Sequence, residues 1–194
     1  MLLENSLDVA QPADKVWLFF QDIPQVAACL PGAELTDDLG DDRYLGRVGV
    51  SMGPVKLLFK GEAHIVERDD AAKRLVVDAA GADEKGRGQA SMVIRAHLVQ
   101  SARGTKVDLE QDLQLSGAAA QYGRGMISDV TAVLMQQFAT NMQHRIEATE
   151  RGEDPNQVVT VAPASGFAIG LRAMRMALGR VFARFFKPYQ PNPS

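Results

Sequence analysis

Three acidic residues, Asp108, Glu110 and Asp112, come closest in this sequence to a catalytic carboxylate group. Neighbouring carboxylates perform general acid–base chemistry when their surroundings separate their pKa values. Here the three alternate with the apolar residues Val107 and Leu109, so in a strand they occupy the face opposite to the apolar one. We therefore interpret them as the solvated face of a strand.

The histidines and the single cysteine also lack a catalytic pattern. His64, His97 and His144 are scattered, and no spacing resembles a metal site. Cys29 has no histidine near it in the sequence, which favours a buried, inert thiol. The glycine-rich stretch "GADEKGRG" (81–88) is expected to be a hairpin turn, because no strand-to-helix transition accompanies it. We predict no catalytic residue, no metal and no covalently bound cofactor.

Amide side chains on apolar faces are the remaining polar candidates. Gln111 has the parity of the apolar residues in its strand, and Gln137 and Asn141 fall on the apolar face of a predicted helix. Leaving a buried amide unpaired costs ~1–3 kcal/mol. The three could bond to one another or to water, or lie exposed near the helix end. Alternatively, they could be polar groups in a mostly apolar cavity, the usual form of a small-molecule site.

Such a cavity would be lined by the inward faces of the strands and of the long helix. Methionines on these faces suit an adaptable lining, although a solid core would contain them too. The predicted ligand-binding residues are Met52, Phe59, Met92, Ile94, Gln111, Leu113, Met126, Val130, Leu134, Gln137 and Asn141.

Hydrophobic periodicity predicts the elements that position these residues. Residues 3–9 alternate as a strand, and two short helices follow, the second opened by Pro24. From about residue 34 to 117 the period is two, which indicates about six antiparallel strands. Residues 119–148 have a helical period and, at ~1.5 Å per residue, are long enough to cross a sheet. We predict an α+β fold in which one long helix covers a curved antiparallel sheet.

The charge of the chain is unevenly distributed. The net charge is −3 over 194 residues. Residues 1–150 carry 15 Lys and Arg against 22 Asp and Glu, a charge of −7, whereas residues 151–194 carry 6 against 2, a charge of +4. An acidic body with a basic tail predicts that the tail has its own anionic partner. The first residues do not resemble a signal peptide, and no apolar run is long and acid-free enough for a spanning helix.

Residues 166–187 form an amphipathic pattern at about 100° per residue. Cations occupy one half of this helical wheel and large apolar residues the other, which is typical of a helix lying in a membrane interface. An acidic groove of a partner or of the chain itself is the alternative acceptor, and nucleic acid does not suit so hydrophobic a tail. The predicted membrane-binding residues are Phe167, Leu171, Arg172, Met174, Arg175, Leu178, Arg180, Phe182, Arg184, Phe185 and Phe186.

Four stretches of the chain resemble the G-subunit family of carbon monoxide dehydrogenase. They are "CLPGAEL" (29–35), "YLGRVGVSMGPVKLLFKGEAHI" (44–65), "GADEKGRGQASM" (81–92) and "GTKVDLEQDLQLSGAAAQYGRGMI" (104–127). The resemblance covers residues 1 to about 148 and implies the helix-grip fold of the START-like (SRPBCC) superfamily. The predicted organisation is therefore a ligand-binding domain (1–148), a flexible linker (149–165), a basic membrane-associating helix (166–187) and a disordered terminus (188–194).

The resemblance also implies an accessory, non-catalytic role beside carbon monoxide dehydrogenase, a molybdenum hydroxylase. Together with the tail, it leads to the hypothesis of a peripheral protein on the cytoplasmic side of the cell membrane. There it would bind a respiratory quinone (menaquinone or ubiquinone), with Gln111 the best-placed donor, and deliver it to the dehydrogenase. Two alternatives stay open: a recruitment factor without a ligand, and a cyclase-type enzyme on the same fold.

Overall fold

Seven strands form one antiparallel sheet in the computed structural model, which describes residues 1–156. The strands are β1 (Leu2–Val9), β2 (Ala33–Gly40), β3 (Arg43–Met52), β4 (Val55–Asp69), β5 (Arg74–Asp83), β6 (Gln89–Ser101) and β7 (Gly104–Leu115). Their order is β1-β7-β6-β5-β4-β3-β2, so β2 to β7 form a meander and β1 pairs with its last strand. The predicted first strand and six-stranded meander are confirmed.

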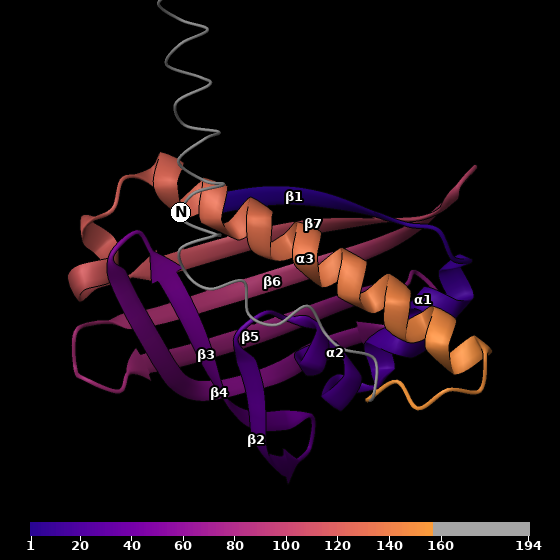
Figure 1. The fold of residues 1–194 in the computed structure, drawn as a ribbon, viewed down its shortest axis with the longest axis horizontal. Coiled ribbons are helices and arrows are strands. Elements are labelled where there is room, and N and C mark those ends of the chain that lie inside the picture. The colour runs from indigo at the N-terminus through magenta and orange to yellow at the C-terminus, as the bar shows by residue number, and fades with distance from the viewer. Residues whose placement is uncertain (157–194) are drawn as a thin grey trace, which may run out of the picture.

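Three α-helices accompany the sheet within residues 1–156. Helices α1 (Ala13–Gln21) and α2 (Ile23–Cys29) follow β1, and α3 (Arg124–Glu150) follows β7 after a short 3-10 helix (Gly117–Gln121). Figure 1 shows α3 running along one face of the curved sheet, with α1 and α2 near its C-terminal half. This is the predicted α+β helix-grip arrangement. The long helix starts later than predicted because the 3-10 helix and an extended Gly123 precede Arg124.

The first two residues of the predicted linker (149–165) still belong to α3, which ends at Glu150. Residues 166–187 and 188–194, predicted to be a membrane-associating helix and a terminus, lie outside the described residues.

The larger of two buried clusters lies where α1 meets the sheet and α3. Trp17 and Phe20 of α1 belong to one buried cluster with Phe138 and Met142 of α3. The rings of Phe20 and Phe138 meet edge to face with their centroids 6.2 Å apart, a favoured aromatic geometry. A second, smaller buried cluster, built around Met52, Leu57 and Ala119, involves the β3–β4 hairpin. The apolar face of the sheet therefore carries two separate clusters.

The outer face of the sheet carries charged residues in pairs. Lys106 Nζ lies 2.8 Å from Asp108 Oδ1, and Arg95 Nη1 lies 3.1 Å from Glu110 Oε1. The hydrogen bond from Lys106 is the main cause that lowers the pKa of Asp108. Asp108, Glu110 and Asp112 therefore form a solvated strand face, as the alternation predicts.

The turn between β5 and β6 is held by a buried carboxylate, Asp83. Its side chain is fully buried and accepts hydrogen bonds from Arg87 Nε (2.8 Å) and from the backbone N–H of Leu58 (3.0 Å) and Lys85 (3.1 Å). The bonds from Arg87, and then those from the backbone, hold the pKa of Asp83 well below its usual range although burial opposes this. Asp83 thus fastens the "GADEKGRG" hairpin turn to β4.

Replacing this carboxylate should weaken the fold in a pH-dependent way. Because the folded-state pKa of Asp83 is depressed, its contribution to stability is present above the ordinary value of 3.8 and is lost as the pH falls below it. Asp83→Asn is therefore expected to lower the melting temperature clearly at pH 7. The difference from the unmodified protein should narrow as the pH falls below 3.8, which thermal unfolding at several pH values measures.

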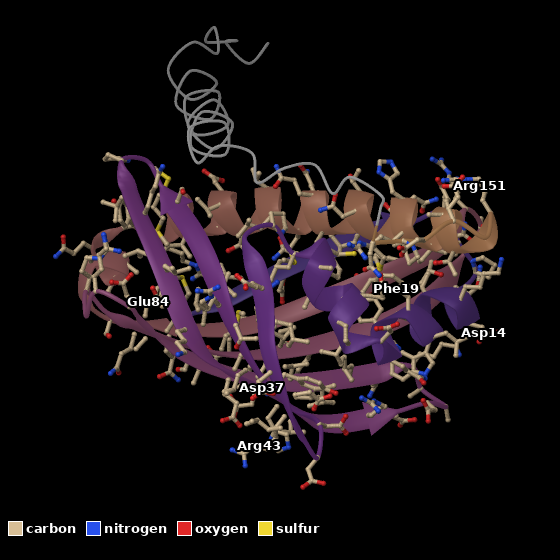
Figure 2. All side chains as sticks on the ribbon, turned by 60° about the horizontal axis from the view of Figure 1, so that its bottom comes forward. Asp14, Phe19, Asp37, Arg43, Glu84 and Arg151 are labelled. Atoms are coloured by element: carbon tan, nitrogen blue, oxygen red, sulfur yellow. The ribbon has the colours of Figure 1, made fainter. Side chains whose placement is uncertain are left out.

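Glu84→Gln is the matched control, since Glu84 is an exposed acid in the same turn (Figure 2). It removes one negative charge without touching the buried hydrogen bonds, so the melting temperature should hardly change. An equal effect of the two substitutions would mean that Asp83 acts through net charge alone.

Candidate functional site

An apolar cavity of about 360 Å³ lies between the concave side of the sheet and helices α2 and α3. Its lining includes Met52 and Phe59 from the smaller buried cluster and Tyr44 and Leu30 from the border of the larger one. The cavity therefore occupies the space that the two clusters leave unfilled. Its volume is at the lower end of the range of ~300–1,000 Å³ found for sites that bury a drug-sized ligand.

Small residues on the inward face of four strands make room for the cavity. Gly46, Gly61, Gly81 and Ala90 pair with one another in one row across β3, β4, β5 and β6, and all four line the cavity. No side chain in this row is larger than a methyl group. A Cβ atom on Gly61 would lie 2.0 Å from the carbonyl oxygen of Ala80, so this close strand approach requires glycine.

This row is absent from the predicted site. In the sequence, this row is recognisable as glycine or alanine at positions where the alternation of the strand places the side chain on the inward face. The prediction followed the large apolar residues of this parity, whereas the small ones decide where empty space remains.

Helix α2 forms one wall of the cavity through Ile23 and Ala27. Buried polar side chains of α3 hold this wall. The Asn141 amide donates a hydrogen bond of 2.9 Å to the carbonyl oxygen of Cys29, and Arg145 Nη1 donates one of 2.5 Å to Gln25 Oε1. Asn141 therefore holds the C-terminal end of α2 in place, and its amide N–H is directed at Cys29.

Seven of the eleven predicted ligand-binding residues meet at the cavity. They come from four strands and from α3, and they are Met52, Phe59, Met92, Gln111, Leu113, Val130 and Leu134.

The other four predicted residues lie elsewhere. Ile94 packs against the larger core cluster, and Asn141 is buried against Cys29. Met126, in the first turn of α3, and Gln137 are partly exposed and do not line the cavity. For Asn141 the physical reason is that the C-terminal half of α3 packs on α1 and α2, whereas the α3 residues that line the cavity lie between Ile127 and Met135.

Gln111 is the buried amide of the cavity. It lies on β7, is only 3% exposed and lines the cavity beside Leu113. Within residues 1–156 its side-chain amide has no hydrogen-bond partner. Because the amide is not among the fully buried unpaired atoms of these residues, it is accessible from the cavity and can bond to a ligand or to water.

The charged side chains around the cavity are already paired. At the exposed edge, Arg47 Nη2 lies 2.7 Å from Glu34 Oε2, and Glu62 Oε1 lies 2.6 Å from Arg43 Nε. Figure 2 places Arg43 at the end of the β2–β3 hairpin that points away from α3. These charged groups therefore lie at the exposed edge of the sheet and are neutralised there by each other.

Two hydroxyl groups that line the cavity, those of Thr131 and Tyr44, are placed differently from the Gln111 amide. The Thr131 hydroxyl donates to the carbonyl oxygen of Ile127 at 2.9 Å. Tyr44 lies on β3 near the acids of the β2–β3 hairpin, and burial, followed by the charges of Asp38 and Asp42, raises its pKa. Its hydroxyl is therefore protonated and belongs to the edge of the cavity.

Cys29 is buried and its thiol is not reactive. Burial raises the pKa of the Cys29 thiol to about 12, against the opposing effect of Arg145, so the thiol is protonated and inert as predicted. No cluster of His, Cys, Asp or Glu suited to a metal ion occurs in residues 1–156. Over the same residues, no helix combines the length and the apolar character needed to cross a bilayer.

Known structures share this fold at low sequence identity. A conserved protein from Geobacillus kaustophilus matches with 17% identity and a TM-score of 0.69, over 77% of this chain and 97% of its own. The Zhui aromatase/cyclase from Streptomyces sp. R1128 matches with 18% identity and a TM-score of 0.51, over 77% and 97%. A START superfamily protein from Mycobacterium smegmatis has 14% identity and a TM-score of 0.48, over 76% and 98%. At these identities the first two likenesses show the fold alone.

No curated protein sequence matches the chain. The family model for CoxG, the G subunit of carbon monoxide dehydrogenase, however, matches residues 6–147. The matched range includes α1, α2, β2 to β7 and all but the last turn of α3, so it covers every residue of the cavity wall. The chain belongs to the CoxG family, the G subunits of carbon monoxide dehydrogenase.

Proposed function

We propose that this protein is a non-catalytic accessory protein of carbon monoxide dehydrogenase that carries a hydrophobic ligand. The observation that carries the proposal is the apolar cavity of about 360 Å³ under α3. Its interior offers aliphatic and methionine side chains and one free amide, which suits a largely apolar molecule with a polar group. The family name supplies the proposed enzyme partner.

The ligand we propose is a respiratory quinone, menaquinone or ubiquinone, whose head would enter the apolar cavity and accept electrons from this partner. An enzyme that oxidises carbon monoxide must pass its electrons on, and respiratory electrons usually go to quinones held in the bilayer. A dehydrogenase in water cannot reach a quinone whose chain is buried in lipid. A domain that withdraws the quinone head into an apolar cavity would present it to the enzyme.

The C-terminal segment would keep this domain at the cytoplasmic side of the cell membrane as a peripheral protein. Residues 166–187 carry Arg172, Arg175, Arg180, Arg184 and Lys187 and no acid. Each cation near an anionic membrane surface contributes ~1 kcal/mol to binding, and the apolar face of the predicted helix adds to this.

A cyclase-type reaction has less support from the site. Such an enzyme needs an acid or a base inside the cavity. The acids that line the cavity within residues 1–156, Glu34 and Glu62, are ion-paired at its exposed edge. The likeness to an aromatase/cyclase concerns the fold only. Recruitment of the dehydrogenase without any ligand remains the competing function that the following experiment tests.

Filling the cavity should abolish ligand binding without unfolding the protein. Val130→Trp places a large ring in the cavity, and Met92→Trp does the same from β6. Both variants are expected to lose less than about 1 kcal/mol of unfolding free energy, because the ring enters empty space. Neither should bind a short-chain menaquinone by calorimetry or retain quinone after purification, whereas the unmodified protein should do both.

Val133→Trp is the matched control on the same helix. Val133 is 2% exposed but does not line the cavity, so the same ring should overpack the core and cost ~1–3 kcal/mol in urea unfolding. If the unmodified protein neither binds the quinone nor carries lipid, and Val130→Trp unfolds as easily as Val133→Trp, the carrier proposal fails and recruitment replaces it.

Reversing the charges of the tail should release the protein from membranes. In the full-length chain, replacement of Arg172, Arg175, Arg180 and Arg184 by glutamate is expected to abolish sedimentation with phosphatidylglycerol vesicles. High salt should weaken binding of the unmodified chain only in part, because the apolar face contributes independently of charge.

The control changes the same net charge on the folded domain. Lys56, Lys60, Lys85 and Arg103 are exposed, and their replacement by glutamate should leave most vesicle binding intact. Equal losses in the two variants would show that overall charge, and not the tail, determines membrane binding.

A further inference from the structure

Gln111 is a largely buried polar residue whose amide the fold does not use. Its side chain is 3% exposed and its amide makes no hydrogen bond within residues 1–156, but the amide atoms are accessible from the cavity and are not among the fully buried unpaired atoms. By contrast, Asn141, the other buried amide named above, is bonded to the backbone of Cys29. Gln111 faces the cavity, so its free donors and acceptor are directed at whatever occupies that space.

The position of Gln111 fixes where a polar group of the ligand would lie. Gln111 is on β7, beside the edge strand β1 that α3 contacts, and Val130 of α3 lines the same cavity. The charged residues Glu34 and Arg47 are instead at the exposed edge on β2 and β3. A ligand with one polar end gains the hydrogen bond to Gln111 only if that end enters first. Its apolar chain then points towards the open edge.

An amide differs from a charged group in what it can recognise. It has an N–H₂ group that donates and a carbonyl oxygen that accepts. It can therefore donate to the carbonyl oxygen of a quinone or accept from the hydroxyl of the corresponding quinol. A carboxylate would favour the quinol, and a cation would favour the quinone. Among the described residues that line the cavity, Gln111 is the only amide, and the charged side chains are paired at the edge.

We propose that Gln111 is the head-group site of the cavity, that it binds the quinone head innermost, and that it accepts the oxidised and reduced forms alike. This inference rests on the proposed function, because it presupposes a quinone-type ligand. Its consequence is that the carrier takes up either form from the membrane, so the enzyme and not the carrier sets the direction of electron flow.

Calorimetry on the full-length protein tests this with three probes. They are a short-chain menaquinone, the same compound reduced to its quinol under anaerobic conditions, and an isoprenoid hydrocarbon without a head group. The unmodified protein should bind quinone and quinol with dissociation constants within about 10-fold of each other, since one net hydrogen bond serves each. It should bind the hydrocarbon more weakly than either.

Gln111→Leu should reverse this head-group preference. Quinone and quinol should both bind roughly 10-fold more weakly, because one net hydrogen bond is lost. The hydrocarbon should bind as well as before or better, since no buried amide is left unpaired. The free variant should be at least as stable as the unmodified protein. Gln111→Glu should favour the quinol over the quinone, and Gln114→Leu, on the exposed face of the same strand, should change nothing.

The outcomes separate this inference from the proposed function. If the unmodified protein binds no quinone, the proposed function fails and the inference falls with it. If it binds quinone but Gln111→Leu leaves all three affinities unchanged, the cavity is a quinone site and Gln111 is not its head-group contact. A preference above 10-fold for one oxidation state, or unfolding of Gln111→Leu in the absence of ligand, would also overturn the inference.

Discussion

A single helix, α3, has to cover the apolar face of a sheet that is seven strands wide. At ~4.8 Å between strands the sheet spans about 29 Å, whereas a helix with its side chains is only about 10 Å wide. The 27 residues of α3 give a length of about 40 Å, which is enough to run along the sheet. The length of α3 is therefore sufficient to cross the sheet, but the helix is too narrow to cover all seven strands. The sheet curves around α3, and α1 and α2 cover part of what remains.

Side-chain size then decides how much of the concave face is filled. At the α1 end, Trp17, Phe20 and Phe138 fill it. Along the row of Gly46, Gly61, Gly81 and Ala90, nothing larger than a methyl group projects from the sheet. A solid core at this point would need large residues in the same positions. The cavity is thus encoded by small residues in a fold whose geometry already leaves a gap.

The sequence predicts the sheet well because alternation is a local property. It also predicts the inward direction of Gln111, which follows from parity alone. For Gln137 and Asn141, the same periodicity gives the wrong location. They lie on one apolar helical face with Val130, but only the N-terminal half of α3 meets the cavity, and Asn141 instead bonds to Cys29. Which partner a turn of the helix faces depends on the path of α3 across the sheet, and no local pattern contains that path.

In the proposed function, the small cavity and the basic tail are connected by one physical difficulty, the exposure of the ligand's apolar chain to water. A space of about 360 Å³ would enclose a ring system and a short chain, so most of a long polyprenyl chain would extend out of the cavity. Each exposed Å² of that chain costs about 25 cal/mol in water. A carrier that moved freely through water would bear this cost throughout its path. A carrier tethered near the bilayer would avoid it, because the chain can stay in lipid while Gln111 holds the head. In the proposed function, the incomplete enclosure of the ligand is therefore the reason for the membrane tether.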